Sequence, residues 1–277
     1  DKDSKLIKNY PVTQIKVDID EITGMITIIN DGNGIDVCMH PEYNVWIPEL
    51  IFGHLRTSTN YDKQEKRIVG GKNGFGFKLV LIWSTWGKIE TVDHKTKKRY
   101  TQEFIDNLTK IEKPKIERCT NRPYTRISFI PDYKRLGIEG ISSDLISLFK
   151  KRVYDIAAVT DKQVKVYYNN NQLDIKTFQN YVDYYIGDKK TYERLYESNN
   201  DRWEYIVCIS PYDEFRQVSF VNGIYTYQGG KHVDYIVNQI TKKMTVYIKS
   251  RQKIDVKSSS IKEQLMIFLN CTIDNPS

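Results

Sequence analysis

The densest group of glycines in the 277-residue chain lies at residues 69–78, which read VGGKNGFGFK. Glycine permits positive φ angles and a close approach of the backbone to a ligand, and Lys78 adds a positive charge. The apolar residues that follow predict a helix, whose first amides have no partner within the helix and can bind an anion. The segment therefore indicates a phosphate-binding loop, although a glycine-rich surface turn with a solvated lysine would have the same composition.

Two common phosphate-binding motifs do not fit this loop. A Walker loop needs Ser or Thr directly after its lysine, and here Leu79 follows Lys78. A dinucleotide-binding fingerprint needs a third glycine at the position that Leu79 occupies. A nucleotide site at this loop must therefore be of another kind.

Three other segments carry polar side chains that could bind the rest of a nucleotide. Asn30 ends an apolar run and precedes two glycines in INDGNGI, so its amide could bind a base edge while the glycines let the backbone lie against the base. Residues 57–60, TSTN, supply four consecutive small polar side chains. Thr125 lies in residues 124–130, whose pattern predicts a strand.

Hydrophobic periodicity predicts the elements that position these segments. Residues 14–20 and 24–30 predict a hairpin, and further strands are expected at 88–93, 98–104, 124–130 and 163–169. Helices are expected at 43–55, 74–84, 142–160 and 231–250. Several strands follow one another directly, which favours an α+β layer with a mixed, largely antiparallel sheet. The polar, tyrosine-rich residues 185–202 indicate a linker or excursion before a second unit.

Charge and composition limit the class of protein. The net charge is +7, and residues 242–263 alone carry seven basic and two acidic side chains, or +5. Such a cluster could bind a polyanion such as DNA, but a solvated helix face would show the same pattern. No apolar stretch could span a bilayer or serve as a signal region, so a soluble, intracellular protein is expected. The cysteines and histidines lack metal-ligand spacing, so no metal site is expected in the chain.

In this order, the motifs resemble the nucleotide-binding domain of type IIA DNA topoisomerases, specifically the eukaryotic-like topoisomerase II branch of the GHKL ATPase superfamily. NDGNGI is similar to the family's NNGKGI, and GGKNGFGFK to its GGRNGYGAK. WIPELIFGHLRTSTNYD is similar to VPxLIFGxLxTSSNYD. Residues 218–236, VSFVNGIYTYQGGKHVDYI, resemble the start of the family's transducer domain. Departures include Asp31 and Asp36, which the resemblance places beside the base.

The resemblance implies a two-domain α+β architecture. Residues 1–190 would form a GHKL (Bergerat) ATPase α/β sandwich with a mixed, largely antiparallel sheet, without the family's N-terminal helix motif. Residues 191–277 would form the first part of a transducer domain with a ribosomal-S5-like α+β fold. The implied cofactors are ATP and Mg²⁺.

The resemblance also implies roles for individual residues. Asn30 occupies the adenine-reading position, and Thr125 would support the same base through water. The ribose and phosphate contacts would come from Ser58, Thr59 and Asn60. The triphosphate would be wrapped by Gly71, Lys72, Asn73, Gly74, Phe75, Gly76, Phe77 and Lys78. The positions of a lysine-rich loop that touches DNA in the family are taken by Lys249, Arg251 and Lys253.

The chemical step is expected outside these 277 residues. The family's general-base Glu and its magnesium-holding Asn would lie upstream of Asp1, and its switch lysine about ten residues past Ser277. No catalytic residue and no metal ligand are therefore expected in the chain, and we expect no appreciable hydrolysis by it alone.

The implied function is the ATPase gate region of a type II DNA topoisomerase. ATP binding would dimerise two copies, and hydrolysis would drive passage of duplex DNA through a double-strand break. The partners would be duplex DNA, a second copy and the rest of the topoisomerase chain, with no membrane. The location would be the nucleus of a cell, or the host cytoplasm or viral factory for a large DNA virus. The alternatives are an ATP-gated clamp or chaperone-like GHKL module, and a degenerate, non-catalytic homologue.

Overall fold

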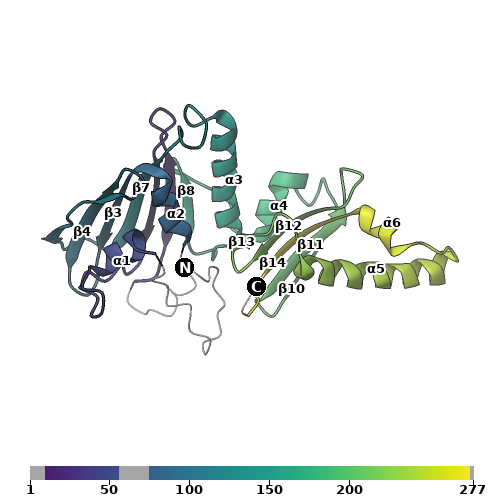
Figure 1. Ribbon diagram of the computed structural model, residues 1–277. Coiled ribbons are helices and arrows are strands. Elements are labelled where there is room, and N and C mark those ends of the chain that lie inside the picture. The colour runs from purple at the N-terminus through teal and green to yellow at the C-terminus, as the bar shows by residue number, and fades with distance from the viewer. Residues whose placement is uncertain (1–9, 56–74, 275–277) are drawn as a thin grey trace. The chain divides into compact units, whose positions relative to one another are not determined.

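The computed structural model describes residues 10–55 and 75–274, and its elements are labelled in Figure 1. The chain divides into two compact units, the first of which reaches Asp174 while the second starts at Ile175. Each unit has its own sheet.

The first unit contains a nine-stranded sheet among its described residues, in the order β5-β4-β3-β7-β2-β1-β8-β9, with β6 paired to β4. Only the β1–β8 pair is parallel among these ladders, so the expected mixed, largely antiparallel sheet is confirmed. The strands are β1 (Gln14–Ile19), β2 (Ile26–Asp31), β3 (Ser84–Val92), β4 (Lys98–Ile105), β5 (Lys110–Ile111), β6 (Lys115–Arg118), β7 (Tyr124–Pro131), β8 (Lys165–Tyr168) and β9 (Asn171–Gln172).

Two short helices cover one face of this sheet. Phe77 makes edge-to-face contacts with Phe52 of the other helix and with Phe129 of β7, at centroid distances of 5.2 and 5.9 Å. A Cβ added at Gly87 of β3 would lie 2.4 Å from a methyl carbon of Leu81, which shows how closely the helix and sheet approach. The helices of the unit are α1 (Ile47–Gly53), α2 (Gly76–Ile82) and α3 (Ser143–Val159).

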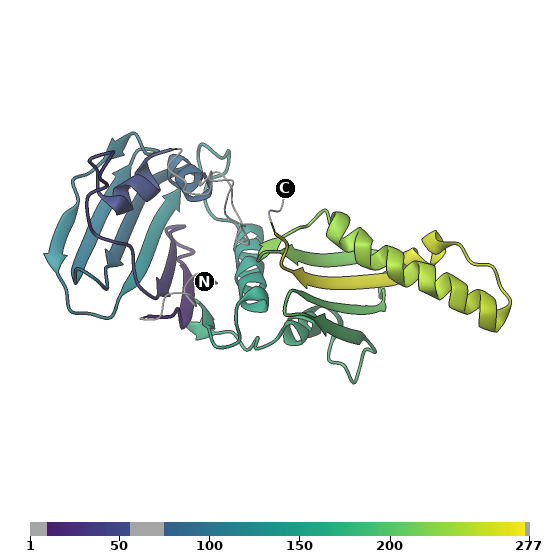
Figure 2. The ribbon, with the colours of Figure 1, turned by 90° about the horizontal axis from the view of Figure 1, so that it is seen from below.

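The second unit is built on a five-stranded sheet in the order β10-β11-β14-β12-β13, with α5 lying along it (Figure 2). The central strand β14 is buried on both faces, which explains its apolar run from Leu265 to Leu269. Its Ile267 and Leu269 pack with Val233 and Val237 of α5. The elements are α4 (Phe178–Ile186), β10 (Leu195–Asn199), β11 (Trp203–Ile209), β12 (Arg216–Val221), β13 (Ile224–Tyr225), α5 (Lys231–Gln252), α6 (Ser258–Glu263) and β14 (Leu265–Cys271).

Residues 185–202, expected to be a linker or an excursion, contain the end of α4 and the strand β10. All five residues of β10 are exposed, so the strand shows no apolar alternation and depends on its pairing with β11. Helix α4 packs within the second unit, where Phe178 and Tyr181 contact Phe220 of β12. This packing explains why the second compact unit starts before residue 190. The functional boundary between an ATP-binding domain and a transducer domain stays a prediction.

Membrane insertion was not expected from the sequence. Within the described parts of the chain, none of the helices combines the length and the apolar character that a membrane span requires.

The contacts of α4 predict that Phe178→Ala destabilises the second unit. Phe178 is 2% exposed, and truncation of a buried phenylalanine typically costs about 3–5 kcal/mol of unfolding free energy. Hydrogen exchange of the β11 and β14 amides, followed in increasing urea, would report the change. The control is Tyr184→Ala on the same helix, because Tyr184 is 58% exposed. Equal destabilisation by the two variants would contradict the packing described for α4.

Candidate nucleotide-binding site

Three polar side chains form a row across the middle of the first sheet. Asn30 of β2 lies opposite Thr125 of β7, and Thr125 lies opposite Thr91 of β3. Directly opposed residues share a face, and it is the face that α1 and α2 cover farther along the strands. The structure thus brings the two predicted base-reading residues together, and it adds a third that the sequence did not indicate.

Thr91 is fully buried and makes three hydrogen bonds through its single hydroxyl group. Its Oγ1 accepts from the amide of Ile35 at 2.9 Å and donates to the carbonyl of Tyr124 at 3.0 Å. The third contact joins it to Oγ1 of Thr125 at 3.0 Å. The only signal for Thr91 in the sequence is a polar residue within a strand pattern, which by itself predicts nothing about a site.

The glycines after Asn30 bring the loop that follows β2 directly onto β3. Gly34 has φ of 70°, and a Cβ at this position would lie 2.0 Å from the carbonyl oxygen of Val92. No other residue fits there without moving the backbone. The sequence suggested that this glycine lets the backbone lie against a base, and in the structure it seats the loop on the end of β3.

A buried carboxylate holds the next part of the same loop. Asp93, directly after β3, accepts from the amide of Val37 at 3.0 Å through Oδ2 and from the amide of Lys95 at 2.8 Å through Oδ1. Thr96 donates its hydroxyl to the same carboxylate at 2.7 Å. Burial would raise the pKa of Asp93, but these hydrogen bonds outweigh it and hold the pKa below its ordinary value.

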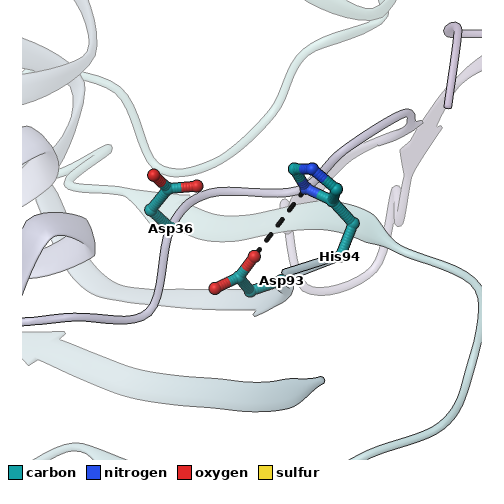
Figure 3. Close-up of side chains that lie close together, drawn as sticks. All are labelled: Asp36, Asp93 and His94. Carbon is teal, nitrogen blue, oxygen red and sulfur yellow. Dashed lines mark ion pairs between the residues drawn. The ribbon is translucent and has the colours of Figure 1, made fainter. Parts of the chain in front are cut away.

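Asp36, Asp93 and His94 offer ligand atoms within 4.8 Å of one another, the spacing of a possible metal site (Figure 3). Each group already has a partner within the protein. Asp36 pairs with Nζ of Lys95 at 2.8 Å, and Nδ1 of His94 lies 3.1 Å from the carbonyl oxygen of Asn33, to which it can donate. The oxygens of Asp93 are also occupied by hydrogen bonds. The three side chains therefore hold the loop after β2 in place, and they do not fit a metal centre.

Asp31, which the resemblance placed beside the base, points away from Thr125 and Thr91. Strand alternation turns it to the opposite face, where it is buried and accepts from the amides of Thr13 and Gln14 at 2.7 and 2.9 Å. Arg122 lies 3.3 Å from its Oδ2. Asp31 therefore fixes the start of β1 against the end of β2.

The described part of the glycine-rich segment begins at Phe75, the residue before α2. Lys78 is 3% exposed, and burial lowers its pKa, so it is not a solvated surface lysine. The ring of Phe77 packs into the apolar layer, so a nucleotide contact by this residue would have to come from its backbone amide. Gly76 faces open space, since a Cβ there would meet no atom within 4 Å. The predicted residues outside the described ranges are Ser58, Thr59, Asn60, Gly71, Lys72, Asn73 and Gly74.

The predicted DNA-contacting residues gather at the end of α5 in the second unit. Lys249, Arg251 and Lys253 are all exposed, and Lys253 ends the helix with φ of 59°. Lys249 pairs with Asp255 at 2.9 Å, while Arg251 lies over the ring of Tyr247. Both contacts are solvent-exposed and therefore weak, so they leave the positive charges available to a polyanion.

Comparison with known proteins connects both units to one family. A family model described as DNA gyrase B matches residues 177–277. DNA topoisomerase 2 of Acanthamoeba polyphaga mimivirus is 44% identical over 266 residues, covering 95% of this chain and 21% of that protein. The probable DNA topoisomerase 2 of Dictyostelium discoideum is 43% identical, with 95% and 17% covered. The chain thus spans about a fifth of the length of these curated relatives.

Solved structures agree with these relatives. The ATPase region of Saccharomyces cerevisiae topoisomerase II matches with a TM-score of 0.90 and 40% identity, over 99% of this chain and 71% of that one. The ATPase and transducer domains of DNA topoisomerase II from Balamuthia mandrillaris match with a TM-score of 0.90 and 36% identity, over 99% and 72%. The architecture is that of a GHKL ATPase domain followed by transducer structure. The chain belongs to the type II DNA topoisomerase family and corresponds to its ATPase region, which confirms the resemblance drawn from the motifs.

The environment of Asp93 predicts a pH-dependent loss of stability in Asp93→Asn. A carboxyl whose pKa is lowered by folding stabilises the protein above its unfolded pKa of about 3.9, and this contribution is lost as the pH falls through the lower folded value. At pH 7 the variant should lose about 1–3 kcal/mol of unfolding free energy. The deficit should shrink as the pH falls toward 3.

Urea unfolding at a series of pH values would measure this difference. Asp36→Asn is the matched control, because Asp36 forms an exposed ion pair with Lys95 and its loss should change stability by less than about 1 kcal/mol. A deficit in Asp93→Asn that is the same at pH 3 and pH 7 would contradict the role assigned to the carboxylate.

Proposed function

We propose that the first unit binds ATP, with adenine at the row formed by Asn30, Thr125 and Thr91 and the phosphates toward α2. The observation that carries this proposal is the row itself, because it places hydrogen-bonding groups beside a loop that Thr91 and Asp93 already hold in place. Lys78, buried in α2, supports the phosphate end. The similarity to the ATPase region of Saccharomyces cerevisiae topoisomerase II supports the same assignment.

The remaining predicted ATP contacts, from Ser58 to Asn60 and from Gly71 to Gly74, are part of this proposal. Mg²⁺, when bound, would supply positive charge that offsets the negative charge of the phosphates. The bonded cluster of Asp36, Asp93 and His94 does not fit this ion, so we assign no magnesium ligand to the described residues. We likewise assign no general base. Glu49, for example, is held by Nε2 of Gln102 at 2.8 Å and lies 3.3 Å from His54.

For the whole protein we propose an ATP-hydrolysing type II DNA topoisomerase. In this proposal, ATP binding brings two copies of the chain together, and hydrolysis drives one DNA duplex through a double-strand break in another. The second unit would transmit closure of the gate and touch duplex DNA through Lys249, Arg251 and Lys253. A nuclear or viral-factory location is part of the same proposal, since the relatives include eukaryotic and mimivirus proteins.

The alternative is an ATP-gated clamp or chaperone-like module without topoisomerase activity. The match of residues 177–277 to the DNA gyrase B model argues against it, because this match covers the second unit and not only the ATP-binding fold. Identities of about 40% to topoisomerases across both units argue in the same direction.

Removal of the Asn30 amide tests the nucleotide site. Asn30→Leu keeps the size of the side chain but removes its acceptor, so we expect ATP to bind roughly 10–100-fold more weakly. Isothermal titration calorimetry with ATP would give the dissociation constants. The control Asn171→Leu changes an exposed asparagine of β9 and should bind ATP like the unchanged chain. Equal affinities for all three proteins would contradict the site.

Neutralisation of the basic loop tests the DNA contact. Changing Lys249, Arg251 and Lys253 together to Ala should weaken duplex binding, and it should reduce the slope of log affinity against log salt by about 2–3, near 0.9 for each lost phosphate contact. Fluorescence anisotropy with a labelled duplex, at several salt concentrations, measures both quantities. The same charge change in the first unit, at Lys110, Lys113 and Lys115, provides the control. An unchanged slope in the α5 variant would contradict the assignment.

A further inference from the structure

The hydroxyl group of Thr91 has its single proton committed to a backbone acceptor. The carbonyl of Tyr124 can only accept, and it lies 3.0 Å from Oγ1. The amide of Ile35 can only donate, and it occupies one lone pair of the same oxygen at 2.9 Å. Because Thr91 is fully buried, bulk water does not compete for these bonds. Thr91 therefore faces its third neighbour, Thr125, with a lone pair and no proton.

This arrangement fixes the direction of the next hydrogen bond. The two threonine oxygens are 3.0 Å apart and one of them must donate. Since Thr91 has no proton left, Thr125 donates to Thr91. A hydroxyl has only one proton, so Thr125 presents only lone pairs to anything else that it meets.

Asn30, on the other side of Thr125, also presents an acceptor. Its Nδ2 donates one of its two protons to the carbonyl of Asp31 at 2.9 Å, which orients the amide and leaves Oδ1 as an acceptor for a ligand. In the part of the chain that the structure describes, no donor reaches this oxygen. The row thus offers two adjacent acceptors, Oδ1 of Asn30 and Oγ1 of Thr125.

We propose that Thr91 is a positioning residue that makes the site selective for an amino group at purine position 6, by holding the Thr125 hydroxyl as an acceptor. This inference rests on the proposed nucleotide site. The 6-amino group of adenine donates to the acceptor row, directly or through one water. A 6-keto group, as in hypoxanthine, is itself an acceptor, so the oxygen that faces position 6 loses the donor that adenine provides, which is the costly outcome for a buried polar group.

Binding of ADP and IDP to Thr91→Val tests the inference. These two nucleotides differ in the base, since ADP has a 6-amino group and IDP has a 6-keto group with a proton on the neighbouring ring nitrogen. Because both are diphosphates, their binding reports recognition of the base without hydrolysis. Valine keeps the shape of threonine without its hydroxyl, so Thr125 becomes free to rotate its proton toward a ligand. We expect the preference for ADP over IDP to fall by roughly tenfold, the value of one hydrogen bond of about 1.4 kcal/mol. IDP should bind the variant more tightly than it binds the unchanged chain.

Three further variants separate this effect from a structural one. Thr91→Ser restores the hydroxyl and should restore the preference. Thr27→Val removes a threonine hydroxyl that bonds Ser128 at 2.9 Å between β2 and β7, on the opposite face of the same sheet, and it should leave the preference unchanged. Thr91→Cys replaces the hydroxyl with a weak acceptor and should lower the preference even if Thr91→Val does not fold.

The outcomes distinguish this inference from the proposed function. If Thr91→Val binds ADP and keeps the full preference, the inference is wrong and the nucleotide site stands. If ADP and IDP lose affinity by the same factor, Thr91 has only a structural role and the inference is again wrong. If the unchanged chain binds no adenine nucleotide at all, the proposed function fails and the inference fails with it.

Discussion

The site depends on side-chain acceptors at the end of β3 that bind backbone amides of the loop after β2. Thr91 accepts from Ile35, and Asp93 accepts from Val37, while the amide of His94 donates to the carbonyl of Asn33 at 3.1 Å. These bonds hold the loop in the way that the backbone hydrogen bonds of a neighbouring strand would hold a strand. The loop consequently has a fixed path although it forms no regular element. Asn30 lies near the end of β2, just before this loop.

A loop held in this way reduces the entropy that nucleotide binding would otherwise cost. A base that binds ordered groups does not have to immobilise them, so more of the interaction free energy appears as affinity. The same bonds determine the polarity of the row, because the one that fixes Thr91 also fixes the direction in which Thr125 donates. In this account, order in the loop and selectivity at the base have the same origin.

The sequence predicted the parts of this arrangement that are local. The NDGNGI and glycine-rich motifs indicated Asn30, and the strand pattern around Thr125 placed that residue in the sheet. Thr91 could not be found in this way, because its importance comes from contacts with residues 34 and 56 positions away in the chain. The exposed strand β10 was missed for a related reason, since its pairing with β11 and not its composition makes it a strand.

Hydrogen exchange at the amides of Ile35 and Val37, without nucleotide, tests the central claim most directly. If Thr91 and Asp93 hold the loop in advance, both amides exchange slowly, at rates close to those of amides within β2. Addition of ADP then changes these rates little. Fast exchange of both amides in the free protein, with protection appearing only when ADP is bound, would show that the nucleotide orders the loop and would contradict the account.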